Sequence, residues 1–332
     1  MPGVPRPGRS RGVVIAWMPV SQRSATIAER LGFDLVLIGR SGFRRAWSAP
    51  LTYPWSAART VWTLARRRPR AAIVAAPPFV AALVALPVLA VLRAPLAIDA
   101  HTGALLDRRW RWSVPILAWL GRRSVATVVT LPSLAVRLQA RGVPTLVVPD
   151  PLPRLTPSPD AGPVARNGAP ARVVAVCGWG LDEPIEALVA AAAGRPWQLT
   201  LTGRPRRDVA PPPNVTLAGF LDDAAYVDLL ASADLVVVLT DREDTLLSGA
   251  WEAVALARPL VLSGTRALRE TFGDAVTYVE PDAAAIAAGI EAALAAALDG
   301  DAPARASDVR DRFARDNDAA LGTLAARVRR GG

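Results

Sequence analysis

The sequence contains no lysine, so its 39 basic residues are all arginines. It has one cysteine, Cys177, which has no partner for an internal disulfide and ends the apolar run VVAVC, where a small buried thiol is expected. A reducing cytosol fits this. No signal peptide is expected, because the first apolar run (13–20) is short and leads to SQRS rather than to a small-residue cleavage site. The chain also lacks a complete dinucleotide fingerprint and a P-loop.

Charged residues are scarce as well. They make up 20% of the 332 residues and hydrophobic ones 52%, which is typical of a globular chain long enough for two domains. The net charge of +10 fits nucleic acid, an anionic membrane or phosphorylated substrates as partners, and it equally fits a coding bias. Nucleic acid is not expected, because no nucleic-acid motif is present and the arginines are scattered.

One uncharged segment, residues 71–92, has the ~20 residues that a helix needs to cross a bilayer. Its prolines argue against a span. Pro77 and Pro78 divide the run into a strand-length piece and a helix-length piece that begins with proline, where proline is tolerated. We therefore predict a buried strand followed by an apolar helix.

Strand-like and helix-like segments alternate over residues 12–150, and this predicts a parallel sheet covered on both faces. Strands are expected at 13–18, 34–39, 71–76, 95–100, 125–130 and 144–150. A polar loop bearing aromatic residues is expected around Phe43, Trp47, Tyr53 and Trp55, followed by a helix over 61–68.

A Pro-rich connection, residues 151–170, separates this domain from a second alternation over 171–302. Residues 303–330 are predicted to form a terminal helix rather than a third domain. The fold class is α/β, with two doubly wound, Rossmann-like domains facing each other across a cleft. Ligands of such sheets bind outside the C-terminal ends of the strands, so the site is expected between the domains.

Residues 241–263 (DREDTLLSGAWEAVALARPLVLS) combine a polar loop, a short helix carrying Glu252 and a buried strand. Backbone N–H groups and the positive end of the helix dipole suit a phosphate at the start of such a helix. An acidic residue further along the helix suits a sugar hydroxyl. The stretch is therefore a candidate nucleotide-sugar site.

Within it, DTLLSGAWEAVALARPLV (244–261) resembles the signature of GT-B glycosyltransferases of family 4, in which two acidic residues with seven residues between them bracket the donor. The resemblance implies that Glu252 holds the ribose and Asp244 the donor sugar. Asp244 replaces the usual glutamate, so neighbouring Glu243 could take its place. A carboxylate on the helix surface is the alternative for Glu252.

The resemblance extends to the first domain, where one subgroup of these enzymes has PP at one strand end and D-x-H at the next. Here these are Pro77-Pro78 and Asp99-Ala100-His101. The resemblance implies that His101, the only histidine, contacts the transferred sugar in a retaining reaction without metal. Asp99 is expected to orient His101 or to hold the loop, with a general-base role also open. A structural, hydrogen-bonded histidine is the alternative.

Phosphate-binding residues depart from the family's pattern. The family usually offers an arginine and a lysine, but residues 178–183 (GWGLDE) supply neither, which leaves an inactive relative open. Arg204 is the best replacement, since a guanidinium grips phosphate as a fork. Arg23 is predicted to reach the donor phosphates or the acceptor, with a surface arginine as the alternative. Further donor contacts are expected from Gly203, Thr245, Ser248 and Gly249, with helix capping as the alternative for the last two.

The segment 108–124 (RRWRWSVPILAWLGRRS) joins arginines and tryptophans to an apolar side. Such a helix can lie on an anionic bilayer surface, which would suit a lipid-linked acceptor. Packing against the core explains the apolar part equally well.

Together these features predict a glycosyltransferase that moves a sugar from a nucleotide-diphosphate sugar to a glycan or lipid-linked acceptor, in cell-surface polysaccharide or glycoconjugate synthesis. No cofactor or metal is expected besides the nucleotide-sugar substrate. The expected location is the cytoplasm, with a peripheral position on the inner face of the membrane left open. The alternatives are a nucleotide-sugar epimerase and a non-catalytic GT-B partner protein.

Overall fold

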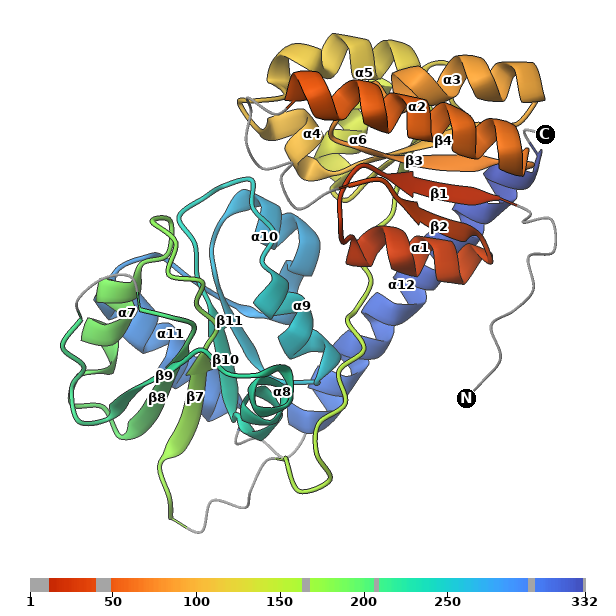
Figure 1. The fold of residues 1–332 in the computed structure, drawn as a ribbon. Coiled ribbons are helices and arrows are strands. Elements are labelled where there is room, and N and C mark those ends of the chain that lie inside the picture. Colours follow the sequence, from red (N-terminus) through yellow and green to blue (C-terminus); the bar gives the residue numbers. More distant parts are fainter. Residues whose placement is uncertain (1–11, 40–48, 163–167, 206–208, 298–301, 331–332) are drawn as a thin grey trace. The chain divides into compact units, whose positions relative to one another are not determined.

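The computed structural model describes residues 12–39, 49–162, 168–205, 209–297 and 302–330. These residues form two compact units (Figure 1). Unit 1 consists of the chain up to Pro151 together with the segment from Asp316, and unit 2 consists of Leu152–Arg315.

Unit 1 contains a six-stranded parallel sheet in the order β2-β1-β3-β4-β5-β6. Every residue of β1, β3, β4 and β5 is buried, because helices cover both faces of the sheet. This burial explains why these strands are mostly apolar without alternating polar residues; the polar exceptions are Asp99 in β4 and Thr127 in β5. The strands are β1 (Val13–Ala16), β2 (Asp34–Leu37), β3 (Ala72–Ala76), β4 (Leu96–Ala100), β5 (Ala126–Val129) and β6 (Thr145–Val147).

Two helical layers enclose this sheet (Figure 1). The first contains α1 (Gln22–Leu31) and the C-terminal part of α12 (Ala302–Arg330), whose Leu321, Leu324 and Val328 pack with the strands. The second layer contains α2 (Ala49–Arg67), α3 (Val80–Leu92), α5 (Val114–Gly121) and α6 (Pro132–Gln139). The short helices α4 (Thr102–Leu106) and η2 (Arg111–Ser113) connect β4 to α5.

The uncharged run 71–92 forms β3 and α3, which confirms the predicted strand and helix. In the part of the chain that the structure describes, no helix combines the length and the apolarity needed to cross a bilayer.

The aromatic loop predicted ahead of residue 61 is wrong from Ala49 onward, where α2 begins. Pro54 breaks the sequence pattern of a helix because it lacks an N–H. Tertiary packing outweighs this loss: Trp17 packs edge-on against Tyr53 at 5.7 Å, and its Nε1 donates to Thr60 at 2.9 Å. Trp55 is therefore helical, whereas Phe43 and Trp47 lie outside the described residues.

Unit 2 contains a second six-stranded parallel sheet, in the order β12-β11-β10-β7-β8-β9. Alternate residues of β7 enter different cores: Val173 and Ala175 pack with α7 (Ile185–Ala192) and α11 (Ala283–Ala297), and Val174 packs on the opposite face. The strands are β7 (Ala171–Ala175), β8 (Trp197–Thr202), β9 (Val215–Gly219), β10 (Leu235–Val238), β11 (Leu260–Ser263) and β12 (Thr277–Val279).

The opposite face of this sheet is covered by α8 (Asp223–Ser232), α9 (Ser248–Ala255), α10 (Arg266–Phe272) and the first part of α12. There Trp251 of α9 and Phe272 lie 5.4 Å from Phe313 of α12, measured between ring centroids. The helix α12 therefore contributes to both cores rather than forming a domain of its own. The predicted pair of doubly wound parallel sheets is confirmed.

Candidate functional site

In unit 1, a buried ion-pair network lies at the C-terminal end of β4. Arg23, at the start of α1, donates from Nε to both carboxylate oxygens of Asp99, at 3.0 and 3.2 Å. Its two other nitrogens donate to Asp150 at 2.8 Å and to the carbonyl groups of Pro149 and Val148. Ser21 caps α1 by accepting from the Ser24 N–H, and this fixes the start of the helix that carries Arg23.

Burial alone would raise the pKa of Asp99, but the charge of Arg23, together with His101, outweighs it and holds this pKa well below its ordinary value. Burial opposes the charged form of Arg23 as well, and here Asp99 and Asp150 prevail and raise its pKa. Both side chains are therefore ionised at neutral pH.

His101 is the N-cap residue of α4, and its Nε2 lies 3.4 Å from Oδ2 of Asp99. Apart from this contact, Nε2 is buried and has no hydrogen-bond partner among the described residues. The side chain as a whole is 28% exposed. Asp99 is 1% exposed and cannot meet a substrate directly, so the geometry favours the orienting role over that of a general base.

The prediction that Arg23 meets a phosphate or an acceptor needs correction. The side chain is 7% exposed, and each of its three nitrogens already donates a hydrogen bond inside the unit. Its role in the structure is to hold Asp99 and the chain around Asp150. Neither the ion pair with Asp99 nor the contact with Asp150 was predicted from the sequence.

Unit 2 has a cavity of about 490 Å³ at the C-terminal ends of β7, β8 and β10. Three predicted donor residues, Gly203, Ser248 and Gly249, line it. Other lining residues come from the loop after β7, from the loop between β9 and α8, from α8 and from the loop before α9; they include Cys177, Gly178, Glu183, Phe220, Asp223, Tyr226, Leu246 and Leu247.

Glu252, on the second turn of α9, lies behind this cavity. Its carboxylate accepts a hydrogen bond from the hydroxyl of Tyr226, which itself lines the cavity. Burial raises the pKa of Tyr226 and the bond to Glu252 raises it further, so the tyrosine remains a neutral donor. Tyr226 could not be found from a local sequence pattern, because its contact with Glu252 joins α8 to α9.

Two glycines allow the backbone to come close at this site. A Cβ at Gly249 would lie 2.7 Å from a methyl group of Val176, so the glycine lets α9 approach the end of β7. Gly203 has φ of +82°, and a Cβ there would lie 2.2 Å from the Cys177 carbonyl oxygen. No side chain caps α9, and its N-cap residue is Leu247, so Ser248 does not act as the cap.

Asp244 and Glu243 are both engaged with the start of α10. Asp244 forms an ion pair with the side chain of Arg266, and Glu243 accepts from the Arg266 backbone N–H at 2.8 Å. Glu243 is thus bound to the N-terminus of α10 through one carboxylate oxygen, and its role in place of Asp244 stays a prediction. Thr245 is partly exposed in the same loop.

The loop after β7 is organised by the carboxylate of Glu183. Glu183 accepts from the backbone N–H groups of Gly178 at 2.9 Å and Trp179 at 2.7 Å. Trp179 has φ of +59° and is 2% exposed, with its Nε1 donating to Thr202. Arg204 follows Gly203 at the end of β8, and its guanidinium lies 4.9 Å from the ring centroid of the exposed Phe220.

Cys177 is a buried free thiol, as predicted. Burial raises its pKa, and the nearby Glu183 raises it further, so it remains a thiol. Within the described ranges, no three His, Cys, Asp or Glu side chains gather closely enough to hold a metal ion.

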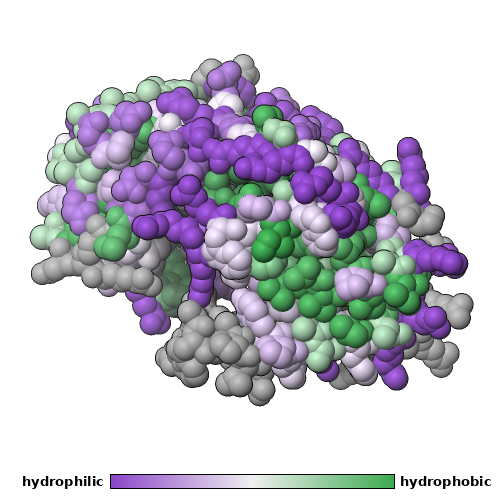
Figure 2. Space-filling view, turned by 90° about the horizontal axis from the view of Figure 1, so that it is seen from above, coloured by the Kyte–Doolittle hydropathy of each residue, from purple (hydrophilic) through white to green (hydrophobic). Residues whose placement is uncertain are grey.

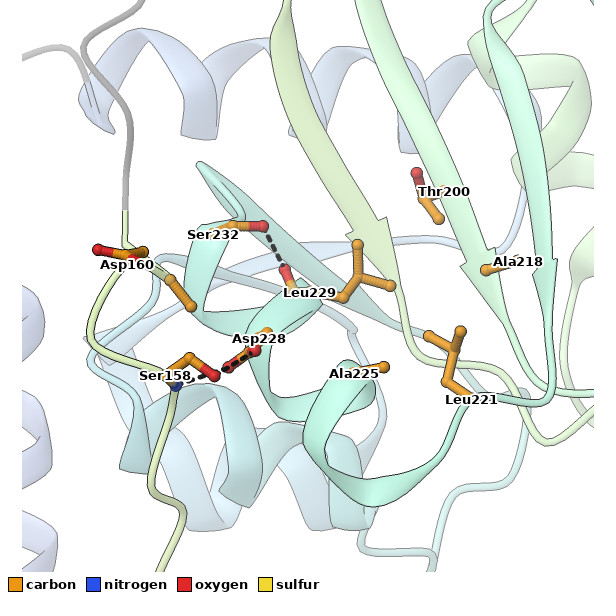
Figure 3. Close-up of a pocket in the computed structure, with 10 residues that line it drawn as sticks. Ser158, Asp160, Thr200, Ala218, Leu221, Ala225, Asp228, Leu229 and Ser232 are labelled. Carbon is orange, nitrogen blue, oxygen red and sulfur yellow. Dashed lines mark hydrogen bonds between the residues drawn. The ribbon is translucent and has the colours of Figure 1, made fainter.

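A second cavity of unit 2, about 530 Å³, contains none of the predicted residues (Figure 3). It lies between residues 158–161 and the surface formed by β8, β9 and α8. Ser158 closes one side of it by donating from both N and Oγ to Asp228, each at 2.7 Å (Figure 3). These bonds tie part of the predicted connection to α8.

Residues 176–296 match the sequence profile of the family described as glycosyl transferases group 1. The match covers the cavity, Glu252 and the predicted signature. No curated protein matches the chain.

Solved structures share the fold of the whole chain. Sucrose-phosphate synthase from Thermosynechococcus elongatus is 16% identical, with a TM-score of 0.70 over 96% of this chain and 98% of that one. Anabaena HepE in complex with UDP is 13% identical, with a TM-score of 0.66 over 95% and 100%. A putative UDP-N-acetylglucosamine 2-epimerase from Listeria monocytogenes is 11% identical, with a TM-score of 0.59 over 96% and 95%. These likenesses confirm the predicted GT-B fold.

Proposed function

We propose that the protein is a glycosyltransferase that moves a sugar from a nucleotide-diphosphate sugar to a glycan or lipid-linked acceptor, with retention. One observation carries this proposal. Three predicted donor residues line a single cavity: Ser248 and Gly249 from the family signature and Gly203 from the end of β8. Glu252 is hydrogen-bonded to Tyr226, which also lines this cavity. This cavity lies within the segment that matches glycosyl transferases group 1.

In this proposal Glu252 receives the ribose hydroxyls, and Tyr226 holds its carboxylate in place. The uncapped N–H groups at the start of α9 and the guanidinium of Arg204 meet the diphosphate. Negative charge develops on the leaving nucleotide in the transition state, and both groups would stabilise it without a resident metal or cofactor.

Asp244 is proposed to contact the donor sugar after exchanging its ion pair with Arg266. Both side chains are about half exposed, and exposed pairs of this kind contribute only about 0–1 kcal/mol, so the exchange costs little. In unit 1, the partly exposed side chain of His101 contacts the reacting sugar, and the buried carboxylate of Asp99 orients the imidazole ring.

HepE in its solved complex binds UDP, and this supports a uridine diphosphate sugar as the first donor to test. We place the reaction in the cytoplasm, in the synthesis of cell-surface polysaccharide or glycoconjugate. A peripheral position at the inner membrane face would bring the protein to a lipid-linked acceptor.

An epimerase is the second candidate, since the Listeria epimerase shares the fold. A non-catalytic GT-B partner protein is a third, supported by the missing lysine and by the Glu183 carboxylate in the loop after β7.

Incubation with UDP-, GDP- and ADP-sugars separates these functions when the products are followed by NMR. A transferase releases the nucleotide diphosphate, slowly without acceptor, and the freed sugar keeps its C2 configuration. A hydrolysing 2-epimerase releases a sugar inverted at C2. Absence of any product with every donor, with and without a glycan or lipid-linked acceptor, favours the partner protein.

A further inference from the structure

The second helical layer of unit 1, formed by α2, α3, α5 and α6, carries most of the large hydrophobic side chains that are exposed among the described residues. Among the described residues, twelve large hydrophobic side chains are exposed, and eight of them lie on this layer or on η2 beside it. They include Trp62, Val91 and Trp112, which are 55%, 84% and 64% exposed. This concentration on one face is unusual, because apolar side chains on a protein surface are ordinarily scattered singly.

The helix α3 (VAALVALPVLAVL) is apolar on every side. Its inner side, with Ala81, Ala85 and Leu89, is buried in unit 1. Its outer side exposes Leu83 and Val91, eight residues apart and therefore on one face of the helix. A helix that is hydrophobic all round is ordinarily covered on all sides. In Figure 2, which looks down on this layer, hydrophobic surface forms a continuous area bordered by hydrophilic surface.

Arginines accompany this surface, and acidic residues are nearly missing. Residues 35–149 contain 16 arginines but only Asp99 and Asp107, although the whole chain has 29 acidic residues. Asp99 is buried and paired with Arg23. A coding bias towards arginine does not explain why acidic residues avoid roughly a third of the chain. The described arginines of this stretch are all exposed.

Several of these arginines lie directly over the exposed tryptophans. The guanidinium of Arg59 is 5.7 Å from the ring centroid of Trp55 and 5.6 Å from that of Trp62, and Arg123 is 4.1 Å from that of Trp119. Such stacking holds a cation and an amphipathic ring next to each other on the protein surface. Tryptophan and arginine are the residues that occupy the headgroup level of a bilayer.

We propose that the outer face of α2, α3 and α5 docks on an anionic phospholipid surface. The apolar side chains of α3 enter the boundary between headgroups and acyl chains, and the arginines of α2 and α5 contact the lipid phosphates. The docking does not depend on the proposed glycosyl transfer. Where both hold, it brings unit 1 to a lipid-linked acceptor.

The charge and the apolar side chains of this face disfavour two other partners, a second copy of the chain and nucleic acid. A second copy of the chain in a two-fold dimer would set the same arginines against each other, and like charges at close range repel. Nucleic acid would engage the arginines but would leave the apolar outer side of α3 uncovered. An anionic bilayer satisfies both parts of the face.

Vesicle flotation tests the proposal with the full chain. The protein is expected to float with vesicles of phosphatidylcholine and phosphatidylglycerol, and not with phosphatidylcholine alone. The substitution Val91→Glu places a charge on the apolar face and should lower partitioning by about tenfold or more. Replacing both Arg66 and Arg123 by glutamine should lower it by roughly fivefold for each arginine and weaken its dependence on salt.

Matched controls use residues of α1 and of unit 2. Leu181→Glu changes a 94% exposed leucine in unit 2, and Arg30→Gln with Arg195→Gln removes two exposed arginines, on α1 and in unit 2. These variants should float like the unmodified protein, and thermal unfolding should show that all variants fold. Equal binding to both vesicle types, no binding to either, or binding unchanged by Val91→Glu overturns the proposal. Self-association that Val91→Glu abolishes, without vesicle binding, overturns it in favour of a dimer.

Discussion

The guanidinium of Arg23 grips the carboxylate of Asp99, with Nε 3.0 Å from one oxygen and 3.2 Å from the other, where both residues are almost wholly buried. The contact joins the start of α1 to the end of β4 and holds Asp99 next to His101. Arg23, which was expected to contact a substrate, therefore has a structural role: it holds the carboxylate that lies next to His101.

We expect Arg23→Met to lower the free energy of unfolding by about 3–5 kcal/mol, because it leaves the Asp99 carboxylate buried without its partner. Urea unfolding measures this loss. The matched control is Arg30→Met, which breaks an exposed pair with Asp318 and should cost less than about 1 kcal/mol. Equal losses for the two variants would contradict the assigned role of Arg23.

The cost of Arg23→Met should also depend on pH. In the unmodified protein the pKa of Asp99 lies below its ordinary value of 3.8, so the ionised carboxylate stabilises the fold above that pH. That contribution is lost as the pH falls through the lower pKa of the folded state. In the variant, burial raises the pKa of Asp99, and acid then favours its folded form. The deficit should therefore be largest near neutral pH and shrink on acidification, and a deficit that does not change with pH speaks against this account.

His101→Ala is expected to lower turnover by ~100-fold, which is the effect of removing one hydrogen-bond donor that points at the reacting group. Affinity for the donor nucleotide should change little, since the nucleotide is proposed to bind in unit 2. Separate measurement of kcat and of donor binding tests both statements. Turnover that survives the substitution would show that the histidine is structural.

Arg204→Ala is expected to weaken binding of a nucleoside diphosphate by about 10- to 100-fold, because a charged hydrogen bond to phosphate is lost. Binding of the nucleoside without phosphates should change far less. Arg195→Ala serves as the control, since Arg195 is an exposed arginine of unit 2 that pairs with Glu291. If nucleoside and nucleoside diphosphate lose affinity equally, Arg204 does not bind phosphate.

The two sheets could be predicted from the sequence because their central strands are covered on both faces and are therefore almost entirely apolar. The cavity-lining Gly203, Ser248 and Gly249 were found from local patterns, a strand end and a helix start. Contacts between distant residues left no such pattern. Arg23 is 76 positions from Asp99 and 127 from Asp150. An arginine near a sheet edge has the same sequence pattern whether it binds a ligand or a buried carboxylate.

The acidic residues before α9 show the same limit. Spacing alone offers Glu243 as a substitute for Asp244. It does not show that Glu243 accepts a hydrogen bond from the first N–H of α10, a helix that the sequence pattern did not predict. Likewise, Tyr226 could not be linked to Glu252 without knowing that α8 lies beside α9.

The most direct test of the donor site is calorimetric titration of the purified protein with UDP-, GDP- and ADP-sugars. We predict that one of them binds, and that Glu252→Ala weakens this binding by about tenfold or more through loss of charged hydrogen bonds to the ribose. Tyr226→Phe should weaken it less, since the carboxylate remains. No binding to any of the three, or equal binding by the Glu252→Ala variant, would contradict the account.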